Sequence, residues 1–89
     1  MNLIIPLKYV YFDQIQSGQK TKEYRLCNEY WRKKLENRQY DNIILTRAYP
    51  RREDSHLRIV KPWKGYVIET ITHPHFGTAP VEVYAIDVS

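Results

Sequence analysis

Cysteine is almost absent from this chain. Cys27 is the single cysteine among 89 residues, so neither an internal disulfide nor a cysteine-rich zinc site can form. The longest apolar run, Leu3–Leu7, contains Pro6 and is far shorter than the roughly 20 residues of a membrane-spanning helix. We find no basic and then apolar leader with a cleavage site, which argues against a signal peptide. We therefore expect one domain over residues 1–89, cytoplasmic and without membrane association.

Glycine is also scarce, and neither sign of charge dominates. The three glycines are each expected where the backbone needs one. Fourteen Lys and Arg against ten Asp and Glu give a formal net charge of +4, which permits RNA, a nucleotide or another anionic partner without requiring one. Aromatic residues, in contrast, are abundant, with eight tyrosines and two tryptophans. Some must fill a small core, and any exposed ring offers a face on which a base can stack.

Periodicity and turn residues predict five or six strands and two short helices. Strands are expected over Leu3–Leu7, Thr21–Leu26, Ile43–Tyr49, Leu57–Val60, Tyr66–Thr72 and Val81–Val88, and helices over Tyr9–Gln16 and Glu29–Arg38. Pro6 restricts the first strand to an edge, a bulge or a strand end. The last strand is apolar on both faces except at Glu82 and Asp87, which is typical of a central strand. This number of strands in a short chain favours an α+β fold built on a small, curled sheet or barrel, with the helices at its mouth.

Several apolar residues outside the strands are also assigned to the interior. We expect a core contribution from Tyr9, Tyr11 and Phe12 on the first helix, from Tyr30, Trp31 and Leu35 on the second, and from a semi-buried Cys27. Asn28 is expected to cap the second helix, because its side chain can accept a hydrogen bond from the first turn.

Charged and polar side chains are concentrated between Gly18 and Arg25, where the first predicted helix ends and a charged strand begins. Gly18 is expected to take the left-handed conformation that ends the helix. Thr21, Glu23 and Arg25 share one face of an alternating strand, and Lys20 stands at the junction. Such a group can bind a polar ligand: the arginine on a phosphate or carbonyl, the carboxylate on an amino group, and the lysine as a mobile cation. A solvated network of surface ion pairs fits the same spacing.

The four residues Gly18, Lys20, Glu23 and Arg25 follow the pattern G-x-K-x-x-E-x-R directly after the first helix. This pattern resembles the hallmark of the ASCH domain family, small PUA-like β-barrels, and Lys8 matches a lysine that is common where the family's first strand enters its helix. The resemblance implies a cleft beside the barrel that binds RNA, a nucleoside or a nucleotide. The residues expected to bind the ligand are Lys8, Gly18, Lys20, Thr21, Glu23 and Arg25.

Catalysis stays open at this stage. Some similar bacterial proteins are amidohydrolases that deacetylate N4-acetylcytidine, with a lysine matching Lys20 implicated, and others are reported as ribonucleases. Those amidohydrolases have a threonine where this chain has Glu23, and a further glutamate in an insertion that is missing here after Thr72. From the residues alone, Lys20 or Glu23 could act as a base and Thr21 as a nucleophile, and Lys20 with Arg25 could serve a metal-free ribonuclease. No cofactor or metal is expected.

Three other groups of residues carry candidate functions. His73 and His75 are two residues apart in a predicted loop and could chelate a metal or, for His73, transfer protons, while His56 is expected to be exposed. A possible nucleic-acid surface combines the residues Arg47, Tyr49, Arg51, Arg52, Lys61, Trp63 and Lys64, although an ordinary basic surface with Tyr49 and Trp63 half in the core fits equally well. The chain could instead dock on a ribonucleoprotein or an anionic protein, through an exposed patch that includes Trp63 or Phe76.

Overall fold

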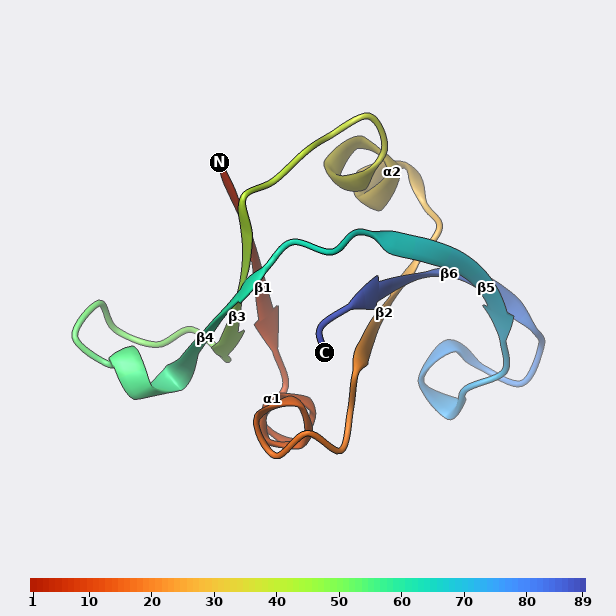
Figure 1. Cartoon of the computed structure of the whole chain (residues 1–89). Coiled ribbons are helices and arrows are strands. Elements are labelled where there is room, and N and C mark those ends of the chain that lie inside the picture. The colour runs from red at the N-terminus through yellow and green to blue at the C-terminus, as the bar shows by residue number, and fades with distance from the viewer.

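The computed structural model describes residues 1–89 and has an α+β architecture of six strands in two three-stranded sheets (Figure 1). The first sheet has the order β1-β3-β4, made of Asn2–Leu7, Asn42–Arg47 and Arg58–Pro62. The second has the order β2-β6-β5, made of Lys22–Leu26, Val81–Asp87 and Tyr66–Ile71. Two helices, α1 (Tyr9–Gln16) and α2 (Glu29–Leu35), and two short 3-10 turns, η1 (Ser55–Leu57) and η2 (Pro74–Phe76), complete the chain.

The first sheet pairs strands that are far apart in the sequence. β1 runs parallel to β3, with Asn2 opposite Asn42 and Leu7 opposite Arg47. Parallel pairing needs a long connection between the two strands, and here that connection contains both helices and β2. Pro6 sits on an edge strand, as its missing N–H predicts. In the second sheet β6 is central, as its apolar sequence predicts, and its residues Val83–Ile86 are all buried.

The two sheets are joined on one side and open on the other. β4 runs into β5 through Trp63, Lys64 and Gly65, and Figure 1 shows the two strands as one long curved ribbon. β1 and β2 are the outer strands on the other side and share no ladder. The predicted barrel is therefore not confirmed, whereas the α+β class is. Pro6 cannot donate a backbone hydrogen bond across this opening, and the Arg25 side chain reaches the Pro6 carbonyl oxygen instead, at 3.2 Å.

One core lies between the sheets and the helices. It consists of eleven buried residues, which are Leu3, Ile5, Leu7, Phe12, Ile15, Leu35, Ile43, Leu45, Tyr84, Ile86 and Val88. Removing a side chain of this size from water contributes roughly 1.5–3 kcal/mol. No helix of the structure has the length and apolar character that crossing a membrane would require.

Most predicted elements are confirmed, but the ends of some elements and the burial of two tyrosines differ. β3 ends at Arg47 rather than Tyr49, because Ala48 takes a left-handed φ of 57°. α2 ends at Leu35 rather than Arg38, because Glu36 is extended and Asn37 takes a left-handed φ of 58°. Tyr9 and Tyr30, which we expected in the core, are 58% and 60% exposed. Both lie in the first turns of short helices, where the single buried stripe is already supplied by Phe12, Ile15 and Leu35.

Candidate functional site

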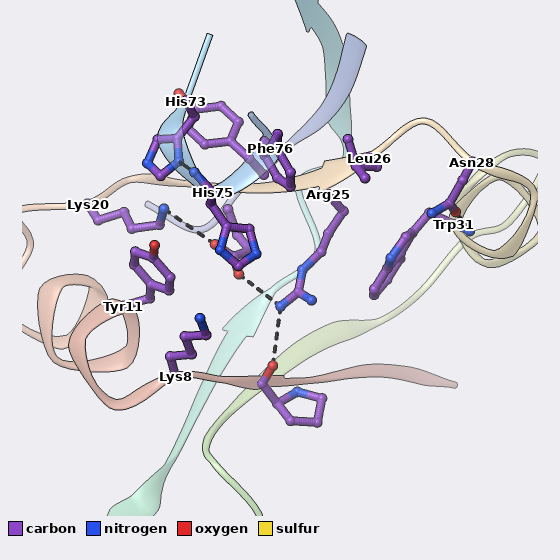
Figure 2. A pocket seen from close by; sticks show the side chains of 13 residues that line it. Lys8, Tyr11, Lys20, Arg25, Leu26, Asn28, Trp31, His73, His75 and Phe76 are labelled. Carbon is purple, nitrogen blue, oxygen red and sulfur yellow. Dashed lines mark hydrogen bonds and ion pairs between the residues drawn. The ribbon is translucent and has the colours of Figure 1, made fainter. Parts of the chain in front are cut away.

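A pocket of about 240 Å³ lies between the edge strands β1 and β2 (Figure 2). Its walls come from five parts of the chain, namely the end of β1, α1, β2, α2 and the η2 turn. The lining residues are Pro6, Lys8, Tyr11, Lys20, Glu23, Tyr24, Arg25, Leu26, Asn28, Trp31, His73, His75 and Phe76. The pocket therefore occupies the position where the two sheets fail to join.

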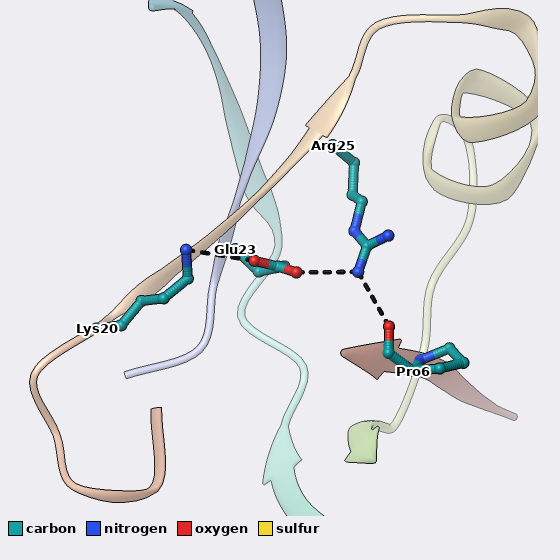
Figure 3. Close-up of polar contacts among 4 residues, drawn as sticks. All are labelled: Pro6, Lys20, Glu23 and Arg25. Atoms are coloured by element: carbon teal, nitrogen blue, oxygen red, sulfur yellow. Dashed lines mark hydrogen bonds and ion pairs between the residues drawn. The ribbon is translucent and has the colours of Figure 1, made fainter. Parts of the chain in front are cut away.

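A nearly buried carboxylate stands in this pocket between two cations (Figure 3). Glu23 is only 5% exposed, and its Oε1 lies 3.4 Å from Lys20 Nζ while its Oε2 accepts a 2.9 Å hydrogen bond from Arg25 Nη2. A buried charge is tolerated only with such partners, because its lost hydration must be replaced. The expected grouping of Lys20, Glu23 and Arg25 is thus present and lies in a hollow rather than on a convex surface.

The turn between α1 and β2 positions Lys20. Gly18 has a φ of +84°, the left-handed conformation expected after the helix, and the Gly18 and Lys20 amides donate to the carbonyls of Ile15 and Gln14. Gly18 itself does not line the pocket. The Lys20 ammonium lies 4.9 Å from the centre of the Tyr11 ring and 5.2 Å from that of Tyr24, so two π faces and one carboxylate surround it.

Arg25 links three elements. Its Nη2 donates both to Glu23 and to the Pro6 carbonyl on β1, and its guanidinium carbon lies 5.1 Å from the centre of the Trp31 ring on α2. Trp31 is held there by Asn28, whose side chain accepts from the Trp31 amide at 2.9 Å as predicted for this cap. The Nε of Arg25 is buried and has no hydrogen-bond partner. An unpaired buried donor costs about 1–3 kcal/mol, which a bound acceptor would recover.

The η2 turn contributes His73, His75 and Phe76 from a segment about fifty residues away in the sequence. His73 Nδ1 accepts a 3.1 Å hydrogen bond from the His75 amide, and the His75 and Phe76 rings meet edge to face at 5.2 Å. Nowhere in the structure do three or more His, Cys, Asp or Glu side chains come together in a way that could hold a metal ion. Both imidazoles line the pocket beside the charged group of Lys20, Glu23 and Arg25.

Two expectations near the motif are wrong. Thr21 precedes β2, is exposed, and borders a separate depression beside Lys22 and Lys64 rather than sharing a face with Glu23. Cys27 is exposed rather than semi-buried, because the chain has left β2 at this point. Local desolvation, with the nearby charges of Glu82 and Glu36, nevertheless raises the pKa of the Cys27 thiol.

The mid-chain cations and aromatics do not form one surface. The residues Arg47, Tyr49, Arg51 and Arg52 lie where β3 ends, and the residues Lys61, Trp63 and Lys64 lie toward the opposite end, where β4 passes into β5. The antiparallel register separates the two groups, with Thr46 opposite Arg58 at one end and Asn42 opposite Pro62 at the other. Trp63 packs against the core and meets the Tyr40 ring edge to face, whereas Tyr49 is 88% exposed.

Sequence reasoning missed several lining residues. The spacing predicts Tyr11 and Trp31 in the core, whereas both are only partly buried and line the pocket. Tyr24 and Leu26 alternate with Glu23 and Arg25 along β2 and are therefore expected on the opposite face of the strand. They nevertheless line the pocket, because β2 is an edge strand. For the η2 residues that line the pocket, the only indication in the sequence was the presence of two histidines in a predicted loop.

A scan against protein-family models, a search of curated proteins and a search of solved structures each found no match for this chain. The resemblance to the ASCH family therefore remains a prediction that is based on the residues at positions 8–25.

Proposed function

We propose that the chain binds a nucleoside, or a single nucleotide of an RNA strand, in the pocket between β1 and β2. The observation that supports this most directly is the Glu23 carboxylate held between Lys20 and Arg25 inside an aromatic-lined hollow. Each carboxylate oxygen retains a lone pair beyond its present partner and can accept from a base amino group. The free nitrogens of Arg25 can donate to a base carbonyl or a phosphate.

The size and the walls of the pocket agree with such a ligand. Its volume of about 240 Å³ is below the roughly 300–1,000 Å³ of most small-molecule sites, which favours one base with its sugar over a larger molecule. Figure 2 shows Tyr11 on one side of the pocket and Trp31 on the other, so that aromatic faces border the polar centre. Three cations, Lys8, Lys20 and Arg25, accompany one carboxylate in the lining, which also favours a ligand with an anionic group.

Nucleoside binding is tested with cytidine, uridine, adenosine, guanosine and N4-acetylcytidine, by thermal shift and calorimetry. A ligand that binds the folded state raises the melting temperature by mass action. We expect Glu23→Gln and Arg25→Lys to weaken binding of the best nucleoside by about ten-fold or more, because each removes a charged or forked hydrogen bond.

Glu69→Gln is the matched control for this experiment. It makes the same charge change in the same sheet, but in an ion pair with Lys22 that lies outside the pocket. We expect the control to bind like the wild type. If neither a nucleoside nor a short RNA oligonucleotide stabilises the wild-type chain, or if Glu23→Gln binds as well as the control, the proposal is wrong.

A hydrolytic function is the second candidate, and it is favoured by the presence of an ammonium, a carboxylate and two imidazoles in one lining. Hydrolysis of an amide needs a base for water, an acid for the leaving amine and a donor for the oxyanion. On N4-acetylcytidine, water would add to the acetyl carbon, the C–N bond would break, and acetate and cytidine would be released. We expect Lys20→Ala to abolish such turnover. Cleavage of an RNA strand by the same pocket would instead indicate a ribonuclease.

A further inference from the structure

A second aromatic surface adjoins the nucleoside pocket. It is a shallow depression formed mainly by Tyr9, Val10, Ala48 and Tyr49, and it shares Pro6 and Lys8 with the pocket. Tyr49 is 88% exposed and is absent from the core cluster and from the residues packed against it. Tyr9 and Val10 are also more than half exposed, at 58% and 54%. We refer to these four residues as the Tyr49 shelf.

The residue before Tyr49 has an unfavourable backbone conformation. Ala48 has a φ of 57°, a left-handed conformation that is unfavourable by roughly 1 kcal/mol or more for a residue with a Cβ atom. Two hydrogen bonds hold it there. The buried Thr46 hydroxyl donates to the Ala48 carbonyl at 2.7 Å, and the Ala48 amide donates to the Leu7 carbonyl at 2.8 Å. Tyr49 directly follows this turn and is 88% exposed, so its ring lies at the surface next to a fixed backbone segment.

The charges around the shelf match a phosphate backbone. Lys8 lies between the shelf and the pocket, is exposed, and takes part in none of the chain's ion pairs. The Arg47 guanidinium stacks over Tyr9 at 4.3 Å from the ring centre. No carboxylate borders the depression. Asp13 is paired with Arg47 at 3.1 Å.

We propose that the Tyr49 shelf is a second nucleotide subsite, on which the base that neighbours the pocket-bound nucleotide in single-stranded RNA stacks while Lys8 binds the phosphate between them. This inference rests on the proposed function, and it specifies the ligand as an RNA strand rather than a free nucleoside. Stacking on an aromatic ring and contact of a cation with the backbone are the two components of single-strand recognition.

The test compares fluorescein-labelled tetraribonucleotides of each base with the corresponding nucleosides. We expect at least one tetranucleotide to bind more tightly than its nucleoside. Tyr49→Ala is expected to lower tetranucleotide affinity about ten-fold and to leave nucleoside affinity unchanged, because a stacked base loses its ring while the pocket is intact. Tyr49→Phe, the matched control, keeps the ring and is expected to bind like the wild type. Lys8→Ala should reduce the slope of log affinity against log salt by about 0.7, the contribution of one phosphate contact in a single strand.

The outcomes separate the two proposals. If nucleosides bind but tetranucleotides bind no more tightly, or if Tyr49→Ala has no effect on them, the second subsite is wrong and the nucleoside pocket stands. The exposed shelf would then belong to a different class of partner, such as a protein. If neither nucleosides nor tetranucleotides bind, the proposed function fails and the subsite fails with it.

Discussion

At the scale of single residues, the pocket residues also hold the fold together. Arg25 connects the carboxylate of β2, a carbonyl of β1 and the Trp31 ring of α2, which are three elements that no ladder joins to one another. Glu23, at 5% exposure, depends on Arg25 and Lys20 for neutralisation. Loss of ligand binding in a pocket variant must therefore be separated from loss of stability.

Arg25→Met should destabilise the chain by about 2–4 kcal/mol, because it leaves the Glu23 carboxylate buried with one partner fewer. Urea unfolding followed by circular dichroism measures this change. The double variant Glu23→Gln, Arg25→Met should recover part of the loss, since the charge that needs a partner is gone. Lys33→Met removes a cation from an exposed pair with Glu29 and should change stability by less than about 0.5 kcal/mol. An equal effect of the two single substitutions would contradict this description of the buried group.

Tyr84 is expected to make the folded chain less stable at alkaline pH. Burial first, and then the 2.6 Å hydrogen bond from its hydroxyl to Glu36, raise the pKa of Tyr84 well above its ordinary value of 10.0. The unfolded chain therefore loses this proton near pH 10 while the folded chain keeps it, and the free energy of unfolding falls as the pH rises above 10. Urea unfolding on both sides of this pH should show the decline, and Tyr84→Phe should make it shallower. An unchanged pH dependence in that variant would show that other groups cause the decline.

At the scale of elements, turns and caps place the charged side chains. The left-handed Gly18 ends α1 and brings Lys20 back over Tyr11, and the Asn28 cap starts α2 with Trp31 facing Arg25. The left-handed Gly18 and the Asn28 cap were predicted from the sequence, because each depends on a residue type with a local conformational preference. The contacts of Lys20 with Tyr11 and of Trp31 with Arg25 were not.

Gly18→Ala should destabilise the chain by about 1 kcal/mol, because a Cβ atom disfavours a φ of +84° even though no atom lies within 4 Å of its position. Thermal and urea unfolding would measure the loss. Gly18→Asn should lose less, since asparagine tolerates the left-handed region. If alanine and asparagine behave alike, the backbone conformation at this turn is not the source of the effect.

Features that depend on local sequence could be predicted, whereas features that depend on contacts between distant segments could not. The bounds of α1 and the central place of β6 could be predicted, since spacing and composition determine them. The end of α2 could not, because Asn37 ends it rather than a glycine or proline. The grouping of Lys20, Glu23 and Arg25 was predicted from adjacency, whereas the contributions of Trp31 and His75 depend on how distant segments pack.

At the scale of the whole molecule, one core serves both sheets. Leu3, Ile5 and Ile43 from the first sheet contact the same cluster as Tyr84 and Ile86 from the second, so neither sheet has an interior of its own. A chain of this length has roughly 4–13 kcal/mol of stability at about 0.05–0.15 kcal/mol per residue. The two sheets should therefore unfold together.

Ile86→Ala should cost about 2–5 kcal/mol, a large part of the total, because Ile86 is fully buried. Circular dichroism reports on the strands, and tryptophan fluorescence reports on Trp31 beside the pocket and Trp63 at the junction of the sheets. The two signals should follow one urea transition in the wild type and in this variant. Separate transitions would show that the sheets unfold independently.

The pairing of β2 has a consequence for how the protein is made. β2 carries Glu23 and Arg25, and its only ladder partner is β6, whose register pairs Lys22 with Asp87 and Leu26 with Val83. During synthesis on the ribosome, residues 22–26 emerge long before the strand that holds them in place. The pocket between β1 and β2 should thus be among the last parts of this domain to mature, and a nascent chain arrested before β6 should lack it even when both helices have formed.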